Sequence, residues 1–202
     1  MSSAALFSQS AEAFLDLVRR IPADAWESPG LGSWSVRSLV GHTTRAILTV
    51  ESYLALDEPG DITIPSAEHY YTVALTHFGD DSSVAARGVE AGVWLGDRPE
   101  QRISTALVGA RNLVTAAPKN RVVSIGGMGI LLSEYLRTRV FELVVHTLDI
   151  SRATGIAHTL PIAAVEEATT LAASTAVGRG HGEEVLLALT GRAELPAGFT
   201  VV

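Results

Sequence analysis

The chain has 202 residues, of which 47% are hydrophobic, and its 15 Lys and Arg against 22 Asp and Glu give a formal net charge of -7. This length and apolar content suffice for one sizeable hydrophobic core. Because the sequence contains no run of basic residues, the phosphate contacts that nucleic acids require are not expected. The lack of cysteine excludes disulfides, thiolate metal ligands and a cysteine nucleophile.

Hydropathy along the chain predicts a soluble, cytoplasmic protein without membrane contact. No stretch approaches the roughly 18 consecutive apolar residues of a membrane-spanning helix. The first twenty residues lack the basic start and the uninterrupted apolar run of a signal peptide.

The first half of the chain predicts helices separated by short turns that contain Gly, Pro and Asp. Pro22 ends the first helix, and Ser35 is placed to cap the second. The segments on either side of the turn between Gly96 and Pro99 are either two helices or one bent helix. The expected helical segments are residues 6–21, 36–56, 67–78, 82–96 and 99–117.

The second half contains the longest predicted helix, from Leu131 to Thr154, with Gly155 as the residue that ends it. Before it, "RVVSIGGMG" fits a short strand, a loop that approaches a ligand, or a simple connection, and its glycine spacing is not that of a nucleotide-binding loop. After it we expect a helix over 160–180, a short helix over 183–191 and an extended tail. The Ala-rich segment 163–177 either completes the core or forms a homodimer face.

One polar stripe runs along the otherwise apolar longest helix. At 100° per residue its members fall within an arc of roughly 80°. The stripe comprises Tyr135, Arg139, Glu142, His146 and Asp149.

Two interpretations of this stripe are open. It is either a solvent-exposed face with pairs at i,i+3 and i,i+4, or part of a metal site. Glu142 and His146 lie one turn apart, so a carboxylate oxygen and an imidazole nitrogen can reach one point. His42, at the border of the apolar stripe of the second helix, is either a third ligand or a hydrogen-bonded core residue.

Three stretches resemble a known family. "GSWSVRSLVGHTTRA" (Gly32 to Ala46) is similar to a tryptophan-led helix start that ends in a metal-ligand histidine, and "YLRTRVFELVVHTLDISRATG" (Tyr135 to Gly155) carries the pattern R-x-x-E-x-x-x-H-x-x-D. The closing "LLALTGRAELPAGFTVV" also resembles many members. The family is that of the DinB-like metal-binding four-helix proteins, in the branch of mycothiol-dependent maleylpyruvate isomerases.

The resemblance implies an all-α, DinB/YfiT-like four-helix bundle with additional short C-terminal helices and an extended tail. It implies one metal-binding domain over 1–202, with 160–202 packed as an extension. His42, Glu142 and His146 would be the ligands of a divalent ion, zinc before others. The isomerase itself has a further C-terminal domain, whereas only about forty residues follow Ile162, too few for an independent core.

The resemblance also implies a function. Two imidazoles and one carboxylate leave the fourth position of a tetrahedral zinc site open, as in catalytic sites. The thiol would be mycothiol, and the activity a mycothiol-dependent S-transferase or isomerase acting on a small electrophile. The alternatives are a zinc-dependent hydrolase that activates water and a metal- or ligand-binding protein without catalysis.

Further residues receive supporting roles. Arg139 is expected to bind a substrate carboxylate or to orient Glu142, and Asp149 to accept the second ring proton of a ligand histidine. Trp34 is expected to be a core anchor rather than a substrate platform. His69, Tyr70 and Tyr71 either line the mouth of the site from the third helix or pack in the ordinary way, and ordinary packing is expected. Exposure is expected for His77, His158 and His181.

Overall fold

The computed structural model describes residues 1–77 and 81–201, with side chains described outside 74–82. These residues form eight α-helices, a short 3-10 turn (Ala23–Ala25) and one two-stranded sheet, which confirms the predicted all-α class. The helices are α1 (Ser3–Val18), α2 (Val36–Leu54), α3 (Ala67–His77), α4 (Asp81–Leu95), α5 (Pro99–Ala116), α6 (Leu132–Thr154), α7 (Ile162–Gly178) and α8 (Gly182–Leu189); the strands are β1 (Val122–Ile125) and β2 (Met128–Leu131).

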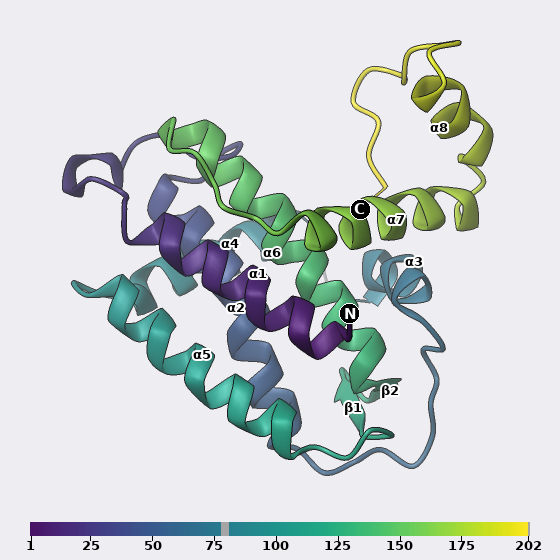
Figure 1. The fold of residues 1–202 in the computed structure, drawn as a ribbon, viewed down its shortest axis with the longest axis horizontal. Coiled ribbons are helices and arrows are strands. Elements are labelled where there is room, and N and C mark those ends of the chain that lie inside the picture. The colour runs from purple at the N-terminus through teal and green to yellow at the C-terminus, as the bar shows by residue number, and fades with distance from the viewer. Residues whose placement is uncertain (78–80, 202) are drawn as a thin grey trace.

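A four-helix bundle forms the centre of the molecule. Helices α1 and α2 each pack against both α5 and α6, so the four helices enclose one core (Figure 1). Each contributes its apolar stripe, because burial of that stripe is the main source of helix stability in a small protein. Fully buried core side chains include Phe7, Phe14, Leu39, Ile47 and Leu143.

The helix boundaries follow local sequence signals. The Ser35 hydroxyl accepts a hydrogen bond from the Ser38 amide at 3.3 Å, which confirms the predicted cap of α2. Gly155 ends α6 with a φ of 69°, as predicted. The segment 82–117 is two helices rather than one bent helix, because Gly96 takes a φ of 59° and interrupts the hydrogen-bond ladder before Pro99 starts α5.

Helix α4 lies directly against the backbone of α2, and glycines make this approach possible. A Cβ atom on Gly41 would lie 2.2 Å from the Gly92 nitrogen, and one on Gly88 would lie 2.7 Å from the Trp34 ring. At Gly41 no side chain fits between the two backbones, and at Gly88 the Trp34 ring occupies the space that a Cβ atom would need. The packing therefore fixes the beginning of α2, which carries His42.

The glycine-rich segment before α6 is a β-hairpin, so the short-strand alternative is correct. Val122 pairs with Leu131 and Ile125 with Met128 in an antiparallel register. Gly126 and Gly127 form the turn with positive φ, which glycine adopts without strain. The second strand runs directly into α6 and so fixes where that helix begins.

The C-terminal helices lie outside the bundle. Helix α7 packs against α6, α3 and α1 and buries Ala164, Ala168 and Leu171, so the Ala-rich segment contributes to the core. Helix α8 packs mainly against α7 and projects away from the body of the molecule (Figure 1). No helix in the described ranges has the length and apolar character needed to cross a membrane.

Candidate metal centre

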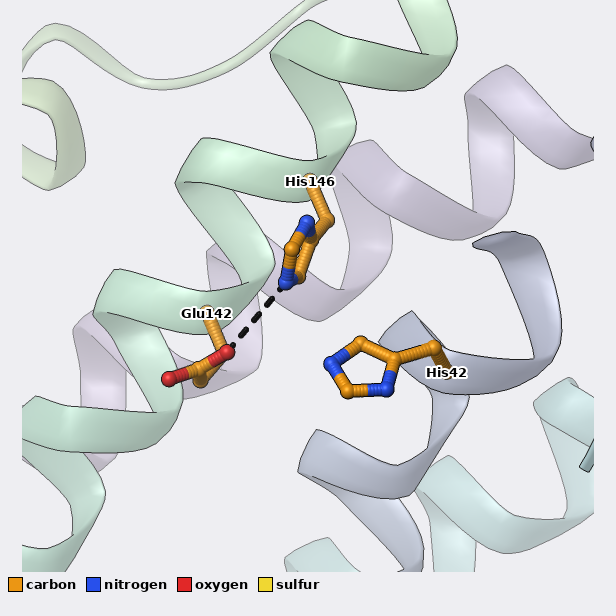
Figure 2. Close-up of side chains that lie close together, drawn as sticks. All are labelled: His42, Glu142 and His146. Atoms are coloured by element: carbon orange, nitrogen blue, oxygen red, sulfur yellow. Dashed lines mark ion pairs between the residues drawn. The ribbon is translucent and has the colours of Figure 1, made fainter. Parts of the chain in front are cut away.

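Three side chains from two helices converge at one point. His42 comes from α2, and Glu142 and His146 come from successive turns of α6 (Figure 2). One ligand atom of each lies within 4.8 Å of the other two. The structure therefore brings together the three residues that the sequence singled out as candidate ligands.

Helix packing sets the geometry of the cluster. Because four residues make about one helical turn, Glu142 and His146 point the same way, and His146 Nε2 lies 3.3 Å from Glu142 Oε2. Across the α2–α6 contact, the rings of His42 and His146 lie 4.9 Å apart at 88°. Figure 2 shows one ring nitrogen of His42 directed toward the other two side chains.

Asp149 supports His146 from the side away from Glu142, with Nδ1 of His146 3.1 Å from the Asp149 carboxylate. Burial by itself lowers the pKa of His146, but the hydrogen bonds to Asp149 and Glu142 outweigh it and raise the pKa to about 9. A protonated imidazole can donate from both nitrogens, which matches its two carboxylate neighbours. Loss of the Nε2 proton would free that nitrogen for a cation while Asp149 keeps the Nδ1 proton.

Glu142 is held ionised inside the protein. Burial raises the pKa of its carboxyl group, yet the hydrogen bond from His146 and the charge of Arg139 lower that pKa to about 2. The hydroxyl of Tyr71 donates to Glu142 Oε1 at 3.0 Å. This Tyr71 contact differs from the ordinary packing that was expected. A buried tyrosine hydroxyl needs a hydrogen-bond partner, but only the fold shows that the partner is Glu142.

His42 is neutral at ordinary pH. Its burial, followed by the charge of His146, lowers its pKa to about 4. The Trp34 ring lies against it, with centroids 4.6 Å apart, while Trp34 Nε1 donates to the Ala85 carbonyl at 3.0 Å. Nδ1 of His42 is buried without a hydrogen-bond partner among the described residues. The Trp34 contact therefore holds the His42 ring, whereas the hydrogen bond to Asp149 holds the His146 ring. Trp34 is thus half-buried and forms a wall of the site.

The polar stripe of α6 is not a solvent-exposed face. Tyr135 is 1% exposed and Arg139 is 8% exposed. The Arg139 guanidinium lies 4.8 Å from the centre of the Tyr135 ring and donates to the Tyr70 hydroxyl at 3.3 Å. Within the described part of the chain, no carboxylate forms an ion pair with Arg139, so it affects Glu142 through its charge rather than through a hydrogen bond.

None of the other histidine side chains that the structure describes belongs to the cluster. His69 and His158 are exposed, and the side chain of His77 lies outside the described residues. His181 differs from the expectation of exposure, because it is half-buried and its ring packs 5.6 Å from that of Phe199.

The described helices form a bundle, and two of them bring two histidines and a glutamate together. Residues 7–151 match the family of mycothiol maleylpyruvate isomerase N-terminal domains, and the chain belongs to this family. The match includes the three candidate ligands and Asp149. No curated protein and no solved structure matches the chain.

The donor set fits a divalent cation of the zinc type. One neutral imidazole, a second that needs to lose a single proton, and an ionised carboxylate are ligands that zinc accepts in protein sites. The Asp149 contact behind His146 is the support that metal-binding histidines usually have. These three residues could therefore hold such an ion.

Proposed function

We propose that this protein binds a divalent cation, zinc before others, through His42, Glu142 and His146 and uses it to present mycothiol to a small electrophile. The convergence of the three ligand atoms within 4.8 Å is the observation on which the proposal depends. Membership of a mycothiol-related family supports the choice of thiol.

The reaction class follows from the donor set and the composition. A bound zinc ion would lower the pKa of a coordinated thiol and hold it as thiolate at neutral pH. The chain has no cysteine, so the thiol is a second molecule. The product would be a thiol conjugate or, after release of the thiol, an isomer with a rearranged double bond.

The surrounding residues have separate parts in this proposal. Asp149 keeps the proton on Nδ1 of His146, so that Nε2 faces the cation. Arg139 supplies a buried positive charge one turn from Glu142, which favours the ionised carboxylate. The same guanidinium, free of a carboxylate partner among the described residues, would attract a carboxylate of the substrate.

Cobalt(II) substitution tests the proposal directly. With cobalt in place of zinc, added mycothiol should produce a sulfur-to-cobalt charge-transfer band. A spectrum that stays unchanged at saturating thiol would reject thiol activation and favour the hydrolase alternative. A thiol band without turnover of any electrophile would favour a binding protein.

Substitution of the ligands tests the residue assignment. His42→Ala, Glu142→Ala and His146→Ala should each strongly reduce the metal content per chain. His158→Ala is a matched control, because this histidine is exposed and does not belong to the cluster. Full metal content in Glu142→Ala would show that the ligand set is wrong.

A further inference from the structure

Tyr71 reaches Glu142 from another helix. It lies on α3, is 4% exposed, and places its hydroxyl 3.0 Å from Glu142 Oε1 and 3.2 Å from the Thr138 carbonyl. Its ring packs at 5.1 Å from that of Phe141 and at 5.2 Å from that of Tyr70. These contacts leave the phenol little freedom to move.

The two oxygens of Glu142 therefore have different surroundings. Oε1 accepts from the Tyr71 hydroxyl, whereas Oε2 lies 3.3 Å from Nε2 of His146. Only one of the two oxygens faces the imidazole pair. A hydrogen bond to an ionised carboxylate is stronger than one to a neutral carbonyl, so Glu142 is the preferred acceptor over Thr138.

The Tyr71 phenol is the donor in this contact, because an ionised carboxylate can only accept a hydrogen bond.

We propose that Tyr71 is a positioning residue that restricts Glu142 to a single oxygen for the cation and so keeps one coordination position available for the thiol. This inference rests on the proposed function. A carboxylate can bind a cation through one oxygen or both, and a hydrogen bond to one oxygen favours the former. Without the phenol, Glu142 could offer both oxygens and occupy the position that the thiol needs.

The test uses Tyr71→Phe, which keeps the ring and removes only the hydroxyl. Cobalt affinity should fall about 10- to 100-fold, the usual effect of losing a partner of a ligand. The visible cobalt spectrum should become weaker, because four-coordinate cobalt absorbs more strongly than cobalt of higher coordination number. The charge-transfer band should require more mycothiol to reach saturation.

Tyr135→Phe is the matched control. Tyr135 is also a buried tyrosine, but its hydroxyl donates to Thr49 at 2.7 Å rather than to a candidate ligand. Both variants should lose a similar amount of thermal stability, and only Tyr71→Phe should change the cobalt spectrum. A Tyr71→Phe protein with the parent's cobalt spectrum and affinity would reduce Tyr71 to an anchor of α3 on α6 and overturn the inference.

A second pair of variants tests the same inference if the Tyr71 ring proves essential for folding. Tyr71→Gln retains a donor and Tyr71→Leu does not, while the two side chains have similar size. Tyr71→Gln should bind cobalt more tightly than Tyr71→Leu, and equal affinities would overturn the inference. If the parent protein binds no cobalt, it is the proposed function that fails.

Discussion

Gly41→Ala should destabilise the protein by about 2 kcal/mol, because α2 and α4 touch at their backbones. The added Cβ would lie 2.2 Å from the Gly92 nitrogen and 2.5 Å from the Ala91 carbonyl carbon. An ordinary contact needs at least about 3.4 Å, so the helices would have to separate by roughly 1 Å. No rotation of a side chain can relieve the clash, since both atoms belong to the backbone.

The expected loss of stability in Gly41→Ala combines two opposing effects. Forcing an extra methyl group into a packed interior costs about 1–3 kcal/mol, and backbone contacts favour the upper end. Replacing glycine by alanine within a helix returns close to 1 kcal/mol. A net loss near 2 kcal/mol lowers the melting temperature by roughly 4–8 °C in a chain of this size.

Thermal denaturation followed by circular dichroism measures this effect. Gly109→Ala is the control, because its Cβ would approach only the end of the Glu51 side chain, at 3.2 Å. That side chain can move, so the control should keep or raise the melting temperature. An unchanged or raised melting temperature in Gly41→Ala would refute the direct α2–α4 contact and the argument built on it.

Four further predictions concern the site and the C-terminal helices. Metal affinity should rise about tenfold per pH unit from pH 6 until it levels near pH 9, because His146, with a pKa of about 9, must lose a proton; a flat profile in cobalt titrations would contradict this. In the metal-free protein the same proton stabilises the fold fully below about pH 6.5, and this contribution should disappear in denaturant titrations as the pH rises through about 9. Gly88→Ala should displace the Trp34 ring, shift its fluorescence and weaken metal binding, and normal binding would show that the Trp34–His42 contact is dispensable. Because α7 buries Leu171 in the core, residues 1–202 should unfold in one transition, whereas two calorimetric peaks would indicate separate units.

Local signals along the chain were sufficient for most helices and for the residue types at the site, although they left open whether residues 82–117 form one bent helix or two helices. The serine cap of α2, the glycine end of α6 and the i,i+4 spacing of Glu142 and His146 depend on neighbours within a few residues. Such contacts follow from helix geometry alone. The stripe of α6 could also be recognised as one face, although its surroundings could not.

Contacts between helices determined the features of the site that these local signals left open. The Tyr71 hydroxyl on Glu142, the Trp34 ring on His42 and the burial of Arg139 all join segments that are distant in the sequence. Periodicity states which residues share a face but not what that face meets, so the exposed and buried interpretations of the α6 stripe were equally compatible with it. The amino-acid sequence thus determined which side chains each helix carries in common, and only tertiary packing determined that two of those helices direct them to one point.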